Sequence, residues 1–292
     1  MNELPTLQLG LPARIRSRSM GMKLIVVCGL ALLMMIPALF VRELVQDRTN
    51  RAADVIRDIS QQVGGQQTFL GPTLAIPYSI APENPSHRAK QGLYLVFPAR
   101  ANAVLKTTAG ERHRSLFKVP VFQANVSLDA SFNLTGVPEA LPQGAVLDWD
   151  RAEMIVGVSD TRGALSNATL TIDGKTSTLV PAQLVPTISI GVDKGLPVYL
   201  TLIGTPAADF AKPGAEFNVT SALRFSGAQR IAVLSYGKTT QVFAQGDWPN
   251  PGFDGGFLPV KRSVSKQGFS AEWSVPFIAR GVRAEGLADS IT

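Results

Sequence analysis

One long uncharged stretch dominates the hydrophobic pattern near the start of the chain. Residues 24–41 read LIVVCGLALLMMIPALFV, eighteen positions without a charge, and Lys23 and Arg42 flank them. As a helix this stretch would be about 27 Å long at about 1.5 Å per residue, close to the hydrocarbon thickness of a bilayer. Pro37 lies in its last third, where a proline kinks a membrane helix rather than abolishing it. The pattern predicts a transmembrane helix that contacts the lipid bilayer through residues 24–41.

A signal peptide and a buried core helix both fit this stretch less well. A cleaved signal peptide has a shorter apolar core and a cleavage site between small residues, whereas residues 39–43 read LFVRE. A buried core helix would carry polar positions among the apolar ones. Because the basic side chains lie on the N-terminal side, we expect residues 1–23 to form a cytoplasmic tail and everything after residue 41 to be exported.

Helical spacing continues beyond the apolar stretch. Apolar residues recur at intervals of three, four or multiples of these, while charges fill the other face: Leu44, Ala52, Val55, Ile56, Ile59 and Val63. The spacing predicts an amphipathic helical stalk over residues 42–65, ended by Gly64 and Gly65. It leaves open whether the apolar face packs on the same chain or on a partner helix.

From residue 66 onward the period changes from that of a helix to that of a strand. Apolar and polar residues alternate over residues 124–134 (ANVSLDASFNL) and 217–225 (FNVTSALRF), and Asp173-Gly174 between two short runs is typical of a hairpin turn. We therefore expect a mainly β fold: an antiparallel β-sandwich-like exported domain over residues 66–292. A weak boundary at residues 160–163 leaves open whether it holds one module or two.

Composition agrees with a chain that partly avoids water. Hydrophobic residues make up 45% and charged residues 17%, against about a quarter charged in soluble domains. The net charge is +6, and residues 1–23 supply half of it, since they hold four basic side chains against Glu3. The remaining charge is spread over the rest of the chain, so we expect no nucleic-acid binding.

Cysteine and histidine offer little chemistry. Cys28 is the only cysteine, so an intrachain disulfide and a zinc site built on cysteines are excluded. A large exported domain without paired cysteines fits a bacterial envelope better than a eukaryotic surface. The two histidines, His87 and His113, have no ligand partner at a suitable spacing, and we expect no metal and no cofactor.

One motif raises the question of catalysis. Ser263 and Lys266 match S-x-x-K, the acylating motif of penicillin-binding enzymes, which needs the serine at the start of a helix. Residues 264–273 instead favour a strand, in which residues three apart point to opposite faces. We interpret the match as coincidence and keep a serine-active cell-wall enzyme as the alternative function.

A second polar cluster is found at residues 160–163, which read DTRG. Asp160 and Arg162 could together hold an anionic group. The simpler interpretation is a capped turn with a local ion pair.

The segment at residues 248–259, WPNPGFDGGFLP, resembles the W-P-[HN]-P-x-F-x-G-x-F-L-P signature of the CreD family of bacterial inner-membrane proteins, which is linked to colicin tolerance. The residues that carry the resemblance are Trp248, Pro249, Pro251, Phe253, Gly255, Phe257, Leu258 and Pro259. It extends to Lys261, Arg262, Gly268, Phe269, Ala271 and Trp273, and upstream to residues 70–77 and 157–163. It covers residues 20–281. Family members continue into several more membrane helices, so a chain stopping at Thr292 suggests a truncated or shortened member.

For the signature segment itself two interpretations remain. In the first, Trp248, Phe253 and Phe257 anchor a proline-stiffened loop that completes the core, while Gly255 and Gly256 allow close backbone approach. In the second, the aromatic residues form a patch facing a partner or lipid.

The resemblance implies a non-catalytic inner-membrane protein that acts in envelope integrity or stress tolerance through protein or envelope contacts. An envelope protein is the expected partner. A periplasmic ligand-sensing domain is a further alternative.

Overall fold

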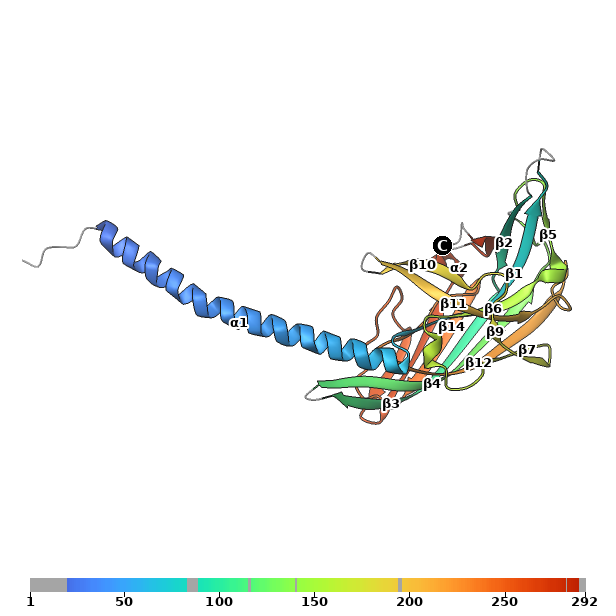
Figure 1. The fold of residues 1–292 in the computed structure, drawn as a ribbon. Helices are drawn as coiled ribbons and strands as arrows, with labels where there is room; N and C mark the ends of the chain where they lie inside the picture. The colour runs from blue at the N-terminus through green and yellow to red at the C-terminus, as the bar shows by residue number, and fades with distance from the viewer. Residues whose placement is uncertain are drawn as a thin grey trace, which may run out of the picture. The chain divides into compact units, whose positions relative to one another are not determined.

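The computed structural model describes residues 20–82, 89–114, 117–139, 141–193, 196–281 and 283–288. It separates into two compact units, Met1–Asp54 and Val55–Thr292, and Figure 1 shows its helices and strands. Three basic residues of the predicted cytoplasmic tail lie outside the described residues: Arg14, Arg16 and Arg18. His87 lies outside them too.

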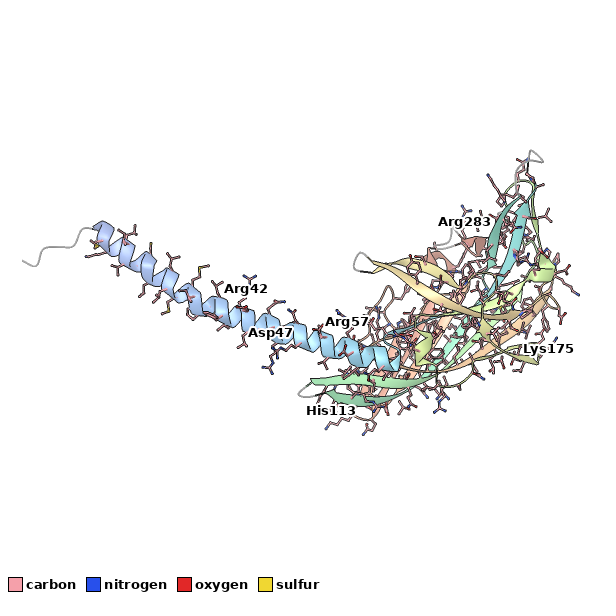
Figure 2. The ribbon with its side chains drawn as sticks, viewed as in Figure 1. Arg42, Asp47, Arg57, His113, Lys175 and Arg283 are labelled. Atoms are coloured by element: carbon pink, nitrogen blue, oxygen red, sulfur yellow. The ribbon has the colours of Figure 1, made fainter. Side chains whose placement is uncertain are left out.

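The first element, α1 (Met20–Val63), is a single 44-residue helix with Pro37 inside it. Its most apolar eighteen-residue window has a mean hydropathy of 2.8, and no side chain in that window is buried. By length and composition the helix can therefore cross a membrane. Arg42 and Asp47 mark the part where charged side chains resume after the apolar stretch (Figure 2). The helix ends before Gly64 and Gly65, whose φ angles are +92° and +62°.

The unit Val55–Thr292 contains two sheets. Nine strands form the first sheet, in the path β10-β11-β6-β1-β2-β17, with β13 and β5 paired to β1 and β9 paired to β11. Their bounds are β1 Gln67–Ile80, β2 Lys90–Val96, β5 Ala145–Leu147, β6 Glu153–Val158, β9 Val180–Pro181, β10 Thr187–Asp193, β11 Leu196–Pro206, β13 Ile231–Val233 and β17 Glu285–Leu287.

The second sheet has eight strands in the order β15-β16-β14-β3-β4-β12-β7-β8. Their bounds are β3 Arg100–Arg114, β4 Phe117–Asn133, β7 Thr169–Ile172, β8 Lys175–Thr178, β12 Glu216–Ala228, β14 Thr239–Gly246, β15 Lys261–Ser265 and β16 Gly268–Val275. Two short 3₁₀ helices, η1 (Trp149–Arg151) and η2 (Thr161–Gly163), and the short helix α2 (Phe277–Arg280) complete the described elements.

The predicted mainly β domain after an N-terminal helix is confirmed. Strand β12 alternates exposed and buried positions over most of its length, which is the period-two signal of its sequence. The hairpin turn between β7 and β8 falls at Asp173 and Gly174, both with positive φ. Most strand pairs are antiparallel as expected, but β14 pairs with β3 and β13 with β1 in parallel.

Two finer points of the fold could not be read from the sequence pattern. Each sheet takes strands from both sides of residues 160–163, so this turn does not separate two successive modules. Residues 264–273 do not form one strand either. They form a hairpin, because β15 turns at Lys266 and Gln267 and β16 begins at Gly268 with a φ of +140°, a conformation that favours glycine.

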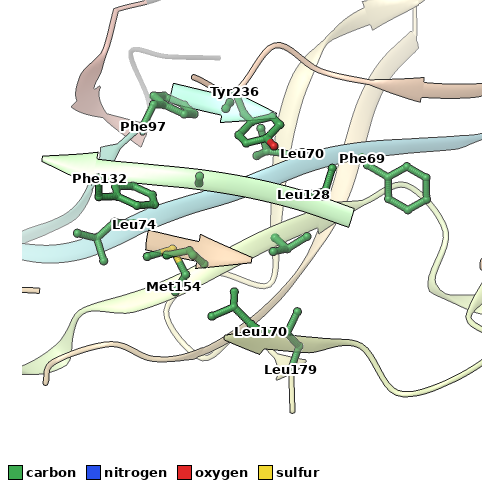
Figure 3. Close-up of a cluster of buried hydrophobic side chains, with 14 of the residues drawn as sticks. Phe69, Leu70, Leu74, Phe97, Leu128, Phe132, Met154, Leu170, Leu179 and Tyr236 are labelled. Carbon is green, nitrogen blue, oxygen red and sulfur yellow. The ribbon is translucent and has the colours of Figure 1, made fainter. Parts of the chain in front are cut away.

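The main core draws on both sheets. Figure 3 shows Phe69, Leu74 and Met154 from the first sheet gathered with Leu128 and Phe132 from the second. Stacked sheets bury the inward side of each strand in this way.

A smaller cluster joins the end of α1 to the second sheet. Ile59 is 7% exposed and packs with Val119 of β4 and Ala228 of β12. Within the unit Val55–Thr292, the apolar face of the stalk helix therefore packs on its own chain.

Candidate functional site

A groove of about 370 Å³ lies between the signature loop and the second sheet. The loop, residues 247–260, is irregular and joins β14 to β15. Residues 251–257 form one wall, and β3, β14, β16 and residues 230–235 form the others. The size falls in the range of about 300–1,000 Å³ that is usual for small-molecule sites.

Aromatic contacts hold the loop on the sheet. The Phe253 ring lies edge-on to Phe269 and to Trp273, with centroids 6.0 and 5.8 Å apart. The Trp273 indole Nε1 donates a hydrogen bond to the Phe257 carbonyl at 3.1 Å, and the Trp248 indole donates to the Asn250 carbonyl at 2.9 Å. Pro249, Pro251 and Pro259 of the same segment are half-buried.

The loop does not complete the core, however. Trp248 and Phe253 are only half-buried, and Phe257, Leu258 and Val260 are 40%, 72% and 63% exposed. The prediction about the glycines was also wrong, because a Cβ at Gly255 or Gly256 would meet no atom within 4 Å. Gly255 instead supplies a φ of +117°, so it is needed for the turn and not for close approach.

The groove is lined mainly by carbon. Two threonine hydroxyls in its walls are already bonded to the protein backbone: Thr107 Oγ1 donates to the Gln245 carbonyl at 3.2 Å, and Thr240 Oγ1 accepts from the Gly237 amide at 3.0 Å. The charges at its edge are Arg230 and Asp254, whose Nε and Oδ1 lie 3.5 Å apart. Such a site accepts an apolar group and offers a pair of opposite charges beside it.

The turn carrying Asp160 and Arg162 lies outside the groove lining. Asp160 caps η2: its Oδ1 accepts from the Arg162 amide at 3.0 Å and from Nε at 2.9 Å, while Oδ2 accepts from Nη2 at 2.6 Å. These side-chain hydrogen bonds from Arg162 are the main reason why the pKa of Asp160 is lowered. The pair therefore forms a capped turn with a local ion pair, and both carboxylate oxygens already have partners.

The same turn belongs to a close-packed junction at the end of α1. Gln67 is fully buried, and its Nε2 donates to the carbonyls of Gly64, Asp160 and Ser226 at 2.5, 3.1 and 3.3 Å. A Cβ at Gly163 would lie 2.4 Å from the Ser226 carbonyl. We call Gly64, Gln67, Asp160, Gly163 and Ser226 the junction.

The groove begins next to this junction. The backbone N–H of Gln67 donates to the Arg230 carbonyl at 3.0 Å. Strand β13 continues from Arg230 along the groove and pairs with β1 from Gln67 onward. Sequence reasoning missed residues 230–235 as a wall, because nothing in the spacing connects them with the signature loop.

The upstream part of the resemblance also marks a packing point. A Cβ at Gly71 would lie 2.3 Å from the Tyr236 ring. Tyr236 is fully buried, its hydroxyl lies 3.0 and 2.9 Å from the Asn102 and Asp129 carbonyls, and burial raises its pKa. Gly71 is thus needed to seat this tyrosine in the core.

The residues considered for catalysis and metal binding lie in strands and turns where their side chains are not arranged as a reactive centre. Ser263 lies in strand β15 and is exposed, and Lys266 lies in the following turn. His113 is near the end of β3 (Figure 2), with its Nε2 3.7 Å from Glu111. Within the described ranges no three His, Cys, Asp or Glu residues are grouped so as to hold a metal ion.

Comparison with known proteins gives the family. Residues 19–290 match the family model described as "Inner membrane protein CreD". The chain is also 26% identical over 260 residues to the "Inner membrane protein CreD" of Escherichia coli (strain K12), a match that covers 87% of this chain and 55% of that relative. The chain thus spans about half the length of the curated relative. With its apolar N-terminal helix and β-rich domain, the chain belongs to the CreD family of inner membrane proteins.

Proposed function

We propose that the chain is a non-catalytic inner-membrane protein whose residues after position 41 lie in the periplasm. In this proposal residues 1–23 are a cytoplasmic tail, residues 24–41 cross the membrane, and residues 42–65 are a stalk. The β-rich domain, residues 66–292, then contributes to envelope integrity or stress tolerance through contacts with envelope molecules.

The observation that carries this proposal is the exposed apolar loop beside an apolar groove. Leu258 is 72% exposed and Val260 63% exposed, although most large apolar residues of the domain are buried. Exposed apolar residues that gather in one place are typical of contact surfaces. The hydroxyls of Thr107 and Thr240 are bonded internally, and Arg230 is paired with Asp254, which favours binding over chemistry.

The expected topology can be tested with a reporter fused after Ala288. We expect a reporter that is active only in the periplasm to work and a reporter that is active only in the cytoplasm to fail, because the basic residues precede the apolar helix. The opposite result would contradict the proposed location.

The role of the loop can be tested in cells that lack their own copy of the protein. We expect Leu258→Asp to increase leakage of a periplasmic enzyme under osmotic stress, at unchanged protein level. Val146→Asp is the matched control, since Val146 is 68% exposed but lies on β5 of the other sheet. Equal leakage in both variants would show that the loop has no specific role in envelope integrity.

The alternative enzyme makes a different prediction. Fluorescent β-lactam should not label the protein covalently, because Ser263 lies in a strand and not at the start of a helix. Labelling that disappears in Ser263→Ala would favour the serine enzyme.

The groove gives some weight to a ligand-sensing domain as a second candidate. A small apolar compound that raises the melting temperature of the chain would support it.

A further inference from the structure

We propose that the groove binds the acyl chain of a zwitterionic phospholipid, with the headgroup at Arg230 and Asp254. This inference deepens the proposed function, on which it rests, because it names the envelope molecule that the loop contacts.

The walls of the groove favour a hydrocarbon chain. Five side chains contribute carbon surface to the groove: Leu105, Val242, Phe253, Phe269 and Trp273. Removing such surface from water is favourable whatever the orientation of the ligand's apolar groups. The hydroxyls of Thr107 and Thr240 are engaged with backbone atoms. A ligand inside the groove is therefore recognised by its apolar surface rather than by hydrogen bonds to these side chains.

The same walls disfavour an extended peptide as occupant. Strands β3, β14 and β16 lie inside the second sheet, where each has a paired neighbour on both sides. A peptide added as a strand needs an open sheet edge for its backbone groups. Its amides would be buried without partners against these three strands, whereas an acyl chain has no polar group to satisfy. Strand β13, whose partner in the described sheet is β1, offers an edge of three residues at most.

The charges at the edge favour a headgroup of both signs. Arg230 and Asp254 have side chains that are 42% and 74% exposed, and they lie 3.5 Å apart. A phosphate at Arg230 would also face Asp254, which repels a purely anionic headgroup. An ammonium group on the same headgroup pairs with Asp254, so a zwitterionic headgroup matches both charges.

The surface beside the groove combines apolar and basic side chains. The exposed Phe257, Leu258 and Val260 stand beside Lys261 and Arg262, which are also exposed. Apolar residues next to basic ones are typical of surfaces that lie in the interface of a bilayer.

The test is photo-crosslinking of the full chain in nanodiscs, which avoids detergent competing for the groove. The probe is phosphatidylethanolamine with a photoreactive group in one acyl chain. Helix α1 provides an internal reference, because its apolar segment should be cross-linked in every sample. We expect a second set of cross-linked peptides that contain residues 230–235, 251–257 and 269–275.

A variant that fills the groove should remove only the second set. Ala244 is half-buried and lines the groove, so we expect Ala244→Phe to lower groove cross-linking at least about tenfold relative to α1. Val146→Phe, at the exposed position of strand β5, is the control and should leave both sets unchanged. If the Ala244→Phe protein does not fold, Phe253→Ala, in the half-exposed loop, provides a second variant with the same expected direction.

The headgroup is tested by exchanging the charges. We expect Arg230→Glu combined with Asp254→Arg to bind the zwitterionic probe several-fold less, and an anionic phosphatidylglycerol probe to cross-link less than phosphatidylethanolamine in the unaltered chain. Equal cross-linking by both probes would overturn the assignment of the headgroup.

Two results would overturn the acyl chain itself: cross-links confined to α1, or groove cross-links that persist at full yield in both Ala244→Phe and Phe253→Ala. A co-purified apolar peptide in the groove would also overturn it. If groove cross-links are absent but the periplasmic reporter fused after Ala288 is active, the lipid proposal is wrong and the proposed function stands. If the groove is cross-linked but only the cytoplasmic reporter is active, the lipid proposal stands and the proposed location is wrong.

Discussion

The junction and the signature loop use the same kinds of residue in opposite ways. Both are rich in glycine, and both lie in the part of the chain that resembles the family. At the junction, the glycines let backbones meet at distances that exclude a Cβ, and Gln67 satisfies three carbonyls. In the loop, Gly255 and Gly256 face open space, and Leu258 is largely exposed. Motif residues therefore mark a packing constraint in one place and a contact surface in the other.

The largest expected difference between the two regions comes from adding one methyl group. Gly163→Ala would place a Cβ 2.4 Å from the Ser226 carbonyl, and we expect a loss of about 3 kcal/mol or more in the free energy of unfolding, the upper end for overpacking. Gly256→Ala meets no atom within 4 Å and should stay within about 0.5 kcal/mol of the unaltered chain. Thermal melting of the full chain measures both. Similar melting temperatures for the two variants would contradict the difference in packing between the junction and the signature loop.

A smaller loss is expected when the polar centre of the junction is removed. Gln67→Leu keeps much of the side-chain volume but leaves the carbonyls of Gly64, Asp160 and Ser226 without this donor. We expect a loss of about 2 kcal/mol, as is usual for buried polar groups left unpaired. The exposed Gln241→Leu on β14 serves as control. An unchanged stability of Gln67→Leu would mean that these bonds contribute little.

Truncating the loop tryptophan should cost less again. Trp248 is half-buried and its indole bonds within the loop, so we expect Trp248→Ala to lower the free energy of unfolding by about 1 kcal/mol. A tryptophan in a core would cost about 3–5 kcal/mol. Melting of the unaltered chain and the variant distinguishes the two, and a loss in the core range would restore the interpretation in which the loop completes the core.

The smallest expected effect comes from removing the negative charge of Asp160. Hydrogen bonds from Arg162 lower its pKa below the ordinary value of 3.8. The ionised carboxylate therefore contributes stability above that value, and the contribution is lost as the pH falls through the lower pKa of the folded state. Asp160→Asn keeps an oxygen to cap η2, so we expect it to cost less than about 1 kcal/mol at pH 7.

The pH dependence sharpens this prediction. The difference in melting temperature between the unaltered chain and Asp160→Asn should be constant from pH 7 to about pH 5 and should shrink below about pH 4. A difference that grows on acidification would have the wrong sign for a carboxylate with a lowered pKa.

Local patterns predicted most of the elements but not their partners. Alternation identified β4 and β12, and Asp173 with Gly174 identified the β7–β8 hairpin, because these signals depend on neighbouring residues. The parallel pairing of β14 with β3 joins residues more than a hundred positions apart, and no local signal encodes it. The hairpin at Lys266 and Gln267 was missed since its sequence lacks the usual turn residues before Gly268.

The candidate site was predicted in part for the same reason. The resemblance singled out Phe253, Phe269 and Trp273, which meet in one aromatic cluster. It did not indicate that Arg230 borders the groove or that Gln67 is the centre of the junction. Both depend on the pairing of β13 with β1, which brings together segments that are far apart along the chain.

The most direct measurement combines topology with the contrast between the two regions. In a Cys28→Ser background, Gly256→Cys and Ser226→Cys are treated in intact cells with a maleimide that enters the periplasm but not the cytoplasm. The account predicts rapid labelling of Gly256→Cys and much slower labelling of Ser226→Cys, because Gly256 is exposed whereas Ser226 is half-buried with its hydroxyl bonded to the Val63 and Gly163 carbonyls. Labelling of Gly256→Cys only after the inner membrane is opened would contradict the account, as would equal labelling of both variants.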